Sequence, residues 1–324
     1  MNQENKKDYQ FQLESDNQLT RIATNFFQNK TAGEYSANDV AVVKEFFYYT
    51  LQSKPFKKYK VALCFICINP PYWEFIAKTI EGAKKFFLPD HRVDYFVWSD
   101  MPLHKEGEGV NYGATMFPTE ATQWPMPTLF RYHLFLQQEE KLKEYDYIFY
   151  CDIDMVFANY VGDEILGEGL TAALHPMYHV RKEYNPPYES NPESAAYIKR
   201  PGRIVEENGK KRFEPLYYAG GMQGGKADKF IEAMKVMRKM IDFDFEKNNF
   251  IPIWNDESVW NKYLFENPPS VILSPAYIYP DSLIEEYYTK IWGRNYSPKI
   301  ITLTKKFTVS KEGGEAVRKM LGTL

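Results

Sequence analysis

Cysteine is scarce in this chain, with three residues in 324, which excludes a disulfide-dense scaffold. Cys64 and Cys67 have C-x-x-C spacing, but they lie inside the apolar run Val61–Ile68, which is typical of a buried strand. A structural zinc site needs a second Cys/His pair nearby, and the neighbouring sequence offers none. We therefore expect structural cysteines rather than redox or zinc chemistry.

An excess of positive charge is also missing. The chain has 40 basic and 43 acidic residues, a net charge of -3, whereas a general nucleic-acid binder normally carries a strong basic excess. We therefore expect no nucleic-acid partner. Any anionic ligand must be bound by a local cluster of side chains or by a metal.

Long apolar runs are absent as well. No stretch approaches the ~20 residues that span a bilayer, and the N-terminus, MNQENKKDYQFQLESDNQ, is too polar for a signal peptide. The sequence thus predicts a protein without a transmembrane segment, most simply a cytoplasmic one.

Aromatic residues, by contrast, are abundant at 17% of the chain. Flat rings pack against the apolar faces of sugars, so this excess fits a protein that handles carbohydrates. A Tyr-rich core and surface would give the same composition, and composition alone leaves both interpretations open.

Strand and helix patterns alternate from residue 60 onward. Apolar strands are expected at Lys60–Ile68, Arg92–Trp98 and Tyr147–Cys151, with helices at Tyr72–Phe87 and Pro127–Tyr145. This alternation predicts an α/β fold with a mainly parallel central sheet. Such sheets bind ligands at the carboxyl ends of their strands.

The rest of the chain divides by composition. Residues 1–58 read as a polar, mostly helical extension, and residues 59–324 as the main domain. Residues 176–215 read as a long irregular segment, which in a compact enzyme usually has a function. The glycine pairs within 217–225 permit a tight turn or a close ligand approach, and they match neither Walker nor dinucleotide spacing.

The sharpest feature is the end of the third strand, at Asp152-Ile153-Asp154. In extended chain, residues i and i+2 point to the same side, so both carboxylates should project together. Two such anions repel unless a positive charge lies between them, and oxygen ligands suit Mg2+ or Mn2+. The pair predicts a divalent-metal site, although a solvated turn would carry the same D-x-D letters.

Two other segments carry polar side chains whose role the residues alone leave open. The segment Trp254–Ser258 supplies Asp256 and Glu257 beside a tryptophan, either for catalysis or, if a helix starts here, with Asp256 as a cap. His175 either orients a sugar hydroxyl or is a core histidine with its hydrogen bonds satisfied.

Together these segments resemble glycosyltransferase family 6, whose animal members include the histo-blood-group A and B transferases and the α-1,3-galactosyltransferases. The resemblance runs from about Lys60 to the C-terminus and depends on the colinear order of many short matches. The matching residues and segments are Tyr72, Phe86-Phe87, His91–Tyr95, Arg131, Asp152–Phe157, Leu174–Pro176, Ser194–Ile198, Tyr217–Gly225, Trp254–Ser258, Asn261–Leu264 and Leu273–Tyr277.

The resemblance implies a GT-A-type domain, with a Rossmann-like central sheet flanked by helices, and a role for each matching residue. Asp152 and Asp154 would bind the Mn2+ or Mg2+ that grips the UDP diphosphate, and Glu257 would be the nucleophile or the stabiliser of the sugar cation. The positions expected at the nucleotide or donor sugar are Tyr72, Arg131 and the triplet Ala219-Gly220-Gly221, and Asp256 would touch donor or acceptor hydroxyls. The positions expected at the acceptor are His175 and Trp254.

The basic tail has a role in the same resemblance. Its candidates for a lid that closes over the diphosphate are Lys305, Lys306 and Arg318. A solvated tail is the other interpretation.

Three departures from the family pattern bear on these expectations. No membrane anchor or stem precedes the domain, which favours a bacterial or viral cytosolic relative. Some bacterial relatives have N-x-N and work without metal, whereas both aspartates are kept here, which favours metal dependence. The family's usual His before Asp-Glu-Ser is Asn255, which leaves that hydrogen-bonding role open.

The function implied is a retaining transferase that moves GalNAc or Gal from a UDP-sugar to a galactose-containing glycan, fucosylated ones included, in α-1,3 linkage. Three small residues in the triplet leave room for an N-acetyl group, so we expect UDP-GalNAc over UDP-Gal and a shift towards galactose in Gly221→Ala. The alternatives are a UDP-Gal-specific transferase, a catalytically weak sugar-nucleotide-binding protein, and a nucleotidyl- or phosphoryl-transfer enzyme, which would lack the segment Trp254–Ser258.

Overall fold

The computed structural model describes residues 57–102, 112–180, 186–199, 203–207, 210–214, 216–281 and 298–303. Apart from Lys57 and Lys58, these belong to one compact unit formed by residues 59–286 and 297–324. The expected N-terminal extension lies outside the described residues except for its last two. The lid candidates Lys305, Lys306 and Arg318 also lie outside them.

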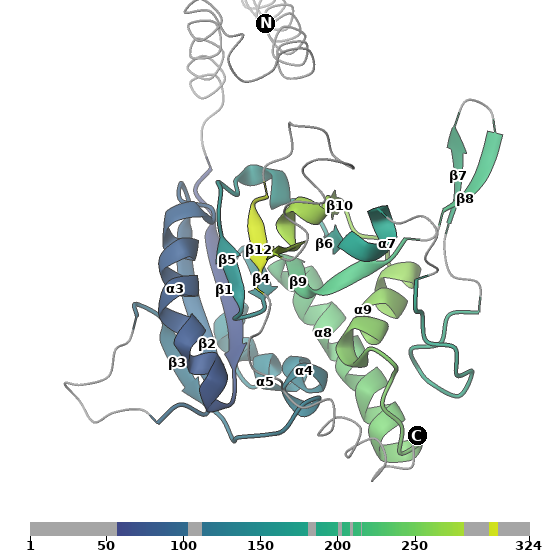
Figure 1. The fold of residues 1–324 in the computed structure, drawn as a ribbon, viewed down its shortest axis with the longest axis horizontal. Coiled ribbons are helices and arrows are strands. Elements are labelled where there is room, and N and C mark those ends of the chain that lie inside the picture. Colours follow the sequence, from purple (N-terminus) through teal and green to yellow (C-terminus); the bar gives the residue numbers. More distant parts are fainter. Residues whose placement is uncertain are drawn as a thin grey trace, which may run out of the picture. The chain divides into compact units, whose positions relative to one another are not determined.

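A seven-stranded sheet forms the centre of this unit, in the order β10-β6-β9-β4-β1-β2-β3 (Figure 1). The strands are β1 (Lys60–Cys67), β2 (Arg92–Ser99), β3 (Thr115–Pro118), β4 (Tyr147–Cys151), β6 (Leu170–Leu174), β9 (Tyr218–Lys226) and β10 (Val271–Leu273). Only β9 runs antiparallel to its neighbours β4 and β6, and the other pairs are parallel. The predicted α/β fold with a mainly parallel sheet is confirmed.

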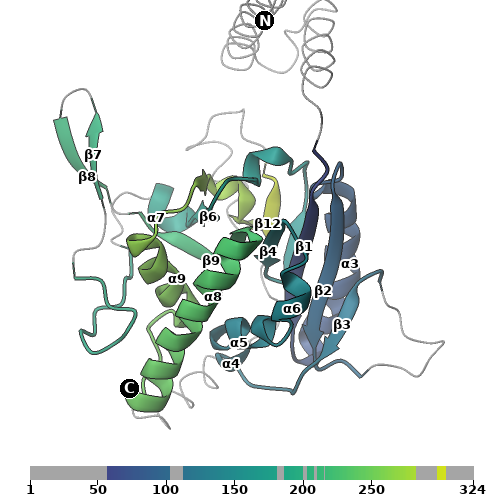
Figure 2. The same cartoon turned by 180° about the vertical axis from the view of Figure 1, so that it is seen from behind.

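Helices cover both faces of the sheet, as parallel strands with two buried faces require. Helix α3 (Pro70–Phe86) lies on one face (Figure 1), and α8 (Ala227–Asp242) lies on the other (Figure 2). Alternate residues of β1 face the two layers: Leu63 packs in the cluster of Ile80 from α3, and Cys64 in the cluster of Met234 from α8.

The cysteines are part of this core. Cys64, Cys67 and Cys151 are free and fully buried. Burial raises the pKa of each thiol because the thiolate loses its hydration. A thiol held neutral in this way is a poor nucleophile and metal ligand, in agreement with the structural role expected from the sequence.

The single helix expected at Pro127–Tyr145 is wrong. The chain forms three short helices there, α4 (Met126–Leu129), α5 (Arg131–Leu136) and α6 (Glu139–Leu142). Phe130 (φ -93°, ψ 17°) and Gln138 (φ -111°, ψ 25°) leave the helical region and break the run. Arg131 follows the first break directly, as the first residue of α5.

The tight turn considered for residues 217–225 is also wrong, because this segment is the long strand β9. Gly224 and Gly225 serve close packing between strands instead. At Gly225 (φ +139°) a Cβ would overlap the backbone of Gly169 and Leu170 beside it, so a residue with a side chain would have to move the neighbouring strand.

Residues 176–215 are only partly irregular, contrary to expectation. They contain helix α7 (Pro176–Val180) and a hairpin of β7 (Arg203–Glu207) and β8 (Lys210–Glu214). Residues 186–199 have no regular structure. Within the described part of the chain, no helix is long and apolar enough to cross a membrane.

Candidate active site

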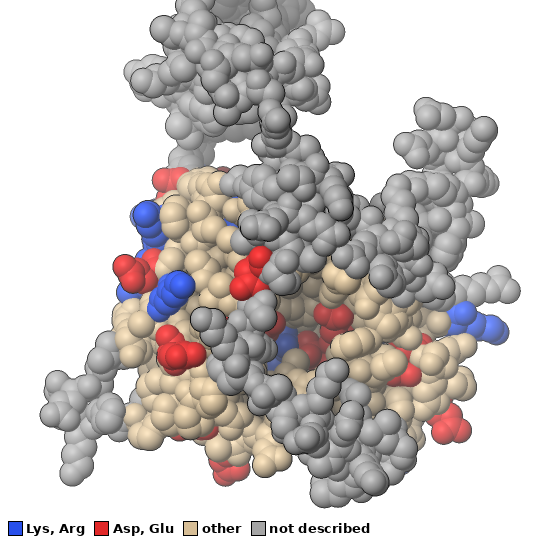
Figure 3. All heavy atoms as spheres, in the orientation of Figure 1, with Lys and Arg blue, Asp and Glu red and all other residues tan. Residues whose placement is uncertain are grey.

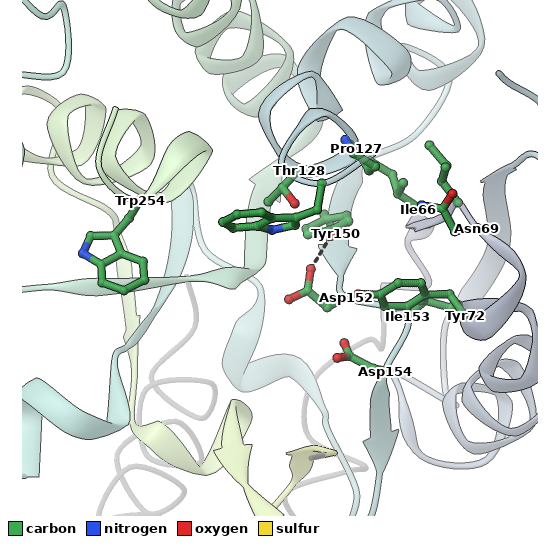
Figure 4. Close-up of a pocket in the computed structure, with 12 residues that line it drawn as sticks. Ile66, Asn69, Tyr72, Pro127, Thr128, Tyr150, Asp152, Ile153, Asp154 and Trp254 are labelled. Atoms are coloured by element: carbon green, nitrogen blue, oxygen red, sulfur yellow. Dashed lines mark hydrogen bonds between the residues drawn. The ribbon is translucent and has the colours of Figure 1, made fainter. Parts of the chain in front are cut away.

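A cavity of about 430 Å³ opens at the carboxyl ends of β1 and β4 (Figure 4). Its lining comes from four parts of the chain, and the residues are Ile66, Ile68, Asn69, Tyr72, Trp124, Pro127, Thr128, Tyr150, Asp152, Ile153, Asp154 and Trp254. The surface view shows a hollow on this face with charged side chains at its base (Figure 3). Among the predicted donor-site residues, Tyr72, Asp152 and Asp154 thus meet in one cavity.

The turn that carries both aspartates is held by three different elements. The Asp152 N–H donates to the Gly221 carbonyl of β9 at 2.9 Å, and the hydroxyl of Thr79 in α3 lies 2.7 Å from the Ile153 carbonyl oxygen. The Asp154 carbonyl accepts from the N–H of Leu303 at 3.0 Å. Leu303 follows β12 (Ile300–Thr302), which pairs with β5 (Met155–Phe157) directly after the turn. Tertiary structure therefore fixes the aspartates in place.

The two carboxylates have different surroundings. The Tyr150 hydroxyl donates to Asp152, as the dashed line in Figure 4 shows, and the Arg131 Nη2 lies 3.7 Å from the same oxygen, Oδ1. The side chain of Asp152 is 36% exposed, whereas Asp154 as a whole is 3% exposed. Asp152 is thus held by a hydroxyl and a cation on one oxygen, with its side chain partly open to the cavity.

These residues fit a divalent metal that takes most of its ligands from substrate. Among the described residues, no group of three or more His, Cys, Asp or Glu side chains is placed to hold a metal by itself. A protein Mg2+ site commonly uses one or two carboxylates and completes its octahedron with phosphate oxygens and water. Asp152 and Asp154 match that donor set, and a diphosphate would supply the remaining oxygens.

Arg131 lies beneath the cavity instead of lining it. It is 2% exposed, its Nη1 donates to the Gly220 carbonyl at 2.8 Å, and its Nε lies 3.1 Å from Asp256 Oδ2. The guanidinium also stacks over the Tyr150 ring at 4.1 Å. Burial acts to lower the pKa of Arg131, but Asp256, Tyr150 and Asp152 outweigh it and raise that pKa. Arg131 therefore joins three structural elements, and it reaches the cavity through Tyr150 and Asp152, which line it.

Asp256 is the partner of Arg131 in a buried ion pair. It is 1% exposed, and its Oδ2 also accepts from Gln223 Nε2 at 3.3 Å. Burial raises the pKa of Asp256 to about 7, although Arg131 acts in the opposite direction. Helix α9 (Asn255–Glu266) has Trp254 in its N-cap position, with no side-chain cap, so the capping role considered for Asp256 is not its role here.

Glu257 stands one residue further along α9 and faces β9. Its Oε2 accepts from the Gly220 N–H at 2.7 Å. Burial raises the pKa of Glu257 to about 7, while the Gly220 N–H and the Tyr217 hydroxyl act to lower it. Tyr217 is 2% exposed, and its buried hydroxyl forms no hydrogen bond of good geometry with any described residue, Glu257 included.

The triplet Ala219-Gly220-Gly221 lies between Glu257 on one side and Asp152 on the other. A Cβ on Gly220 would be 3.0 Å from the Glu257 Cβ, whereas a Cβ on Gly221 would be 2.7 Å from Asp152 Oδ2. Because successive residues of a strand face opposite sides, β9 presents Gly220 to α9 and Gly221 to the D-x-D turn. The triplet thus connects the expected metal site to Glu257.

The two predicted acceptor residues lie in different environments. Trp254 is 47% exposed at the cavity mouth, whereas burial lowers the pKa of His175 to about 4 and keeps its ring neutral. The His175 Nδ1 accepts from the Met177 N–H at 3.2 Å, so the proton of the neutral ring is on Nε2. That N–H is a donor of the kind that a sugar hydroxyl accepts.

Asn255, where the resemblance leads one to expect His, has a left-handed backbone at φ +52°. Asn and His are both among the few residues with side chains that are enriched in this conformation. The backbone therefore accounts for the acceptance of either residue at the first position of α9.

Sequence reasoning did not single out Tyr150 or Tyr217. The signal for Tyr150 was present, because strand alternation puts residues 150 and 152 on the same side. No local pattern pointed to Tyr217, whose position near Glu257 depends on how α9 packs against β9.

Comparison with known proteins adds to this geometry. The family model for glycosyltransferase family 6 matches residues 39–292. The human globoside alpha-1,3-N-acetylgalactosaminyltransferase 1 is 31% identical over 215 residues, 65% of this chain and 58% of that protein. The rat histo-blood group ABO system transferase 1 is 30% identical over 218 residues, 66% of this chain and 59% of that protein.

A bacterial relative matches over a larger share of its length. The O-antigen biosynthesis glycosyltransferase WbnI of Escherichia coli is 25% identical over 252 residues, 76% of this chain and 95% of that protein. The chain spans less than two thirds of the length of the two mammalian relatives.

Proposed function

Since the chain belongs to glycosyltransferase family 6, we propose that it is a retaining transferase that moves GalNAc or Gal from a UDP-sugar to a galactose-containing glycan in α-1,3 linkage. The observation that carries this proposal is the placement of Asp152 and Glu257 on opposite sides of Gly220-Gly221. Asp152 is suited to the leaving diphosphate, and Glu257 to the reacting sugar.

The donor half of the site is built to stabilise charge on a diphosphate. A Mn2+ or Mg2+ bound by Asp152 and Asp154 would neutralise the negative charge that develops on UDP. Tyr150 and Arg131 hold Asp152 in one orientation, so little reorganisation is needed when the ligand binds. Tyr72 and the two isoleucines Ile66 and Ile68 provide apolar surface in the same cavity, which suits the flat nucleotide base.

The sugar half of the site is built around Glu257. Breaking the sugar–phosphate bond develops positive charge at the anomeric carbon, and an ionised carboxylate beside that atom stabilises it. Retention requires either a group such as Glu257 on the face opposite the leaving diphosphate or an ion-pair route. The Gly220 N–H at 2.7 Å favours the ionised form, and His175 and Trp254 are suited to orient and stack the acceptor sugar.

We keep the basic tail in the proposal as a lid over the diphosphate. Leu303 donates its N–H to the Asp154 carbonyl, so the chain that leads to Lys305 and Lys306 starts beside the expected metal site. We include Lys305, Lys306 and Arg318 in the proposed lid on this basis.

Acceptor-independent release of UDP tests the function most directly. UDP-GalNAc and UDP-Gal are each incubated with Mn2+ and with EDTA, and UDP is measured with time. Release should require Mn2+, and Asp154→Asn should reduce it by on the order of 10²-fold, whereas Asp228→Asn at the exposed start of α8 should leave it unchanged. No release from either donor, with metal-dependent UDP binding by calorimetry, would indicate a binding protein. Release that persists in EDTA would refute metal dependence.

Gly221→Ala tests the donor preference, and the structure gives the added methyl group two effects. It would narrow the space for an N-acetyl group, and it would meet Asp152 Oδ2 and Met155 Cε, each at 2.7 Å. We expect a GalNAc-to-Gal rate ratio about 10-fold lower and a higher Mn2+ concentration for half-maximal release with both donors. An unchanged ratio would refute the steric basis of donor choice, and an unchanged Mn2+ requirement would show that Asp152 does not move.

A further inference from the structure

The irregular segment 186–199 contains a buried carboxylate, Glu189, that is not one of the expected donor, acceptor or metal-binding residues. Glu189 is 4% exposed. Its Oε1 accepts from the Asn191 N–H at 2.8 Å, and its Oε2 accepts from the Ile253 N–H at 2.8 Å. Among the described residues Glu189 forms no salt bridge, so two backbone donors on two separate loops compensate for the loss of hydration.

The second of those loops carries Trp254 at the cavity mouth. Ile253 and Trp254 are 44% and 47% exposed. The position of this exposed apolar pair therefore depends on how its backbone is held. The Trp254 N–H donates to Ser258 Oγ at 3.0 Å, and the preceding peptide is held by Glu189. Both N–H groups of the pair are therefore fixed by side chains.

The neighbouring residue, Tyr188, contacts the other side of the acceptor region. Its ring packs edge-on against Tyr217 at 5.2 Å, and Tyr217 packs against His175 at 5.8 Å. The Tyr188 hydroxyl donates to the Leu216 carbonyl. Residue 189 thus contacts the loop that presents Trp254, and residue 188 contacts Tyr217, whose ring in turn packs against His175.

The C-terminal part of segment 186–199 is also held by hydrogen bonds. Asp244, which is fully buried, accepts from the Ser194 hydroxyl at 2.6 Å and from the Ala195 N–H at 2.7 Å. Asn248 Nδ2 donates to the Glu193 carbonyl at 3.0 Å. The segment is therefore a fixed support against which the loop of Trp254 rests.

We propose that Glu189 is a positioning residue that holds Trp254 in register with His175 and so sets the affinity for the acceptor glycan. This inference rests on the proposed transferase function. A carboxylate is required because each of its oxygens accepts one N–H. In Glu189→Gln the amide nitrogen cannot accept, so one backbone donor loses its partner and faces another donor.

Steady-state kinetics of Glu189→Gln tests this positioning role. We expect the KM for a galactose-containing acceptor to rise about 10-fold or more, the size of a lost charged hydrogen bond. Mn2+-dependent UDP release without acceptor should stay within twofold of wild type, because the hydrogen bonds of Glu189 to described residues go to Asn191 and Ile253, neither of which is an expected donor-site residue. Glu193→Gln, an exposed carboxylate in the same segment, is the matched control and should change neither quantity. Equal losses in release and in transfer would overturn the proposal.

A second measurement does not depend on activity. Fluorine NMR of protein labelled with 5-fluorotryptophan reports on each tryptophan, and Trp254→Phe assigns the Trp254 signal. In Glu189→Gln that signal should shift and broaden, while Trp98 and Trp260 in the core should not change. If Glu189→Gln does not fold, Glu189→Asp keeps the charge but cannot span both N–H groups, and it should give the same selective shift.

The kinetic and NMR measurements distinguish the positioning role of Glu189 from the proposed transferase function. An unchanged Trp254 signal would overturn the role of Glu189, whatever the activity. A shifted signal in a protein that releases no UDP from either donor would show that Glu189 positions Trp254, and it would refute the proposed transferase function.

Discussion

Replacing Glu257 by Gln is expected to lower kcat for glycosyl transfer by about 10³-fold. Gln has nearly the same shape and can still accept from the Gly220 N–H at 2.7 Å, but it cannot carry the negative charge that stabilises the anomeric carbon. Metal-dependent UDP binding by calorimetry should remain near wild type, because Asp152 and Asp154 are unchanged.

The matched control for this experiment is Glu266→Gln at the other end of the same helix. The Glu266 side chain is 55% exposed and, within the described part of the chain, pairs only with Lys262, so kcat should not change. If Glu257→Gln kept more than a tenth of wild-type kcat, Glu257 would be neither nucleophile nor cation stabiliser.

The same substitution has a predictable effect on stability. Burial raises the pKa of Glu257 to about 7, so the folded protein binds this proton more tightly than the unfolded chain, whose carboxyl titrates near its ordinary pKa of ~4.3. This contribution to stability is complete below that ordinary pKa and is lost as the pH rises through 7.

Glu257→Gln removes that dependence. Relative to wild type, the metal-free variant should gain free energy of unfolding between pH 5 and pH 8, which urea unfolding at the two pH values measures. A difference between variant and wild type that is the same at both pH values would show that Glu257 has no raised pKa.

Replacing Arg131 by Met is expected to lower the free energy of unfolding by about 3–5 kcal/mol, because it leaves a buried carboxylate without its partner. Asp256 is 1% exposed and lies 3.1 Å from the Arg131 Nε. The loss should be largest at pH 8, where Asp256, with a pKa of about 7, is ionised, and smaller at pH 5.

Two further variants show whether the ion pair causes the loss. Arg238→Met, on a half-exposed face of α8, should change stability by no more than about 0.5 kcal/mol. Adding Asp256→Asn to Arg131→Met should restore part of the lost stability, because the isolated charge is then gone. A double variant as unstable as the sum of the two single variants would refute a direct Arg131–Asp256 interaction.

The sequence predicted the residues whose position depends on local geometry. Asp152 and Asp154 follow a strand that is apolar throughout, so the carboxyl-end rule was enough to place them at a cavity. The extended chain expected at these residues is a turn instead. The layered α/β arrangement followed from the same alternation of patterns, with β1 buried along nearly its whole length.

The sequence did not predict contacts made between distant elements. Arg131 was expected at the nucleotide or donor sugar, which stays a prediction, but its contacts with Gly220 and Asp256 beneath the cavity were not predicted. Arg131 begins α5 directly after the break at Phe130, and no helix propensity indicated that break. The glycines of β9 looked suited to a turn, because the close approach of β4 and β6 on both sides of β9 is not encoded nearby in the chain.

By itself, therefore, the sequence determined the class of fold, the membership of a family and the chemical types of the site residues. Those depend on periodicity and on residue identity, which are read one segment at a time. Tertiary structure alone decided that Gly220 and Gly221 lie between Glu257 and Asp152, and that Glu189 supports the loop of Trp254. The reason is that β9 inserts antiparallel between β4 and β6, and this pairing over long distances in the chain brings together side chains that no local pattern connects.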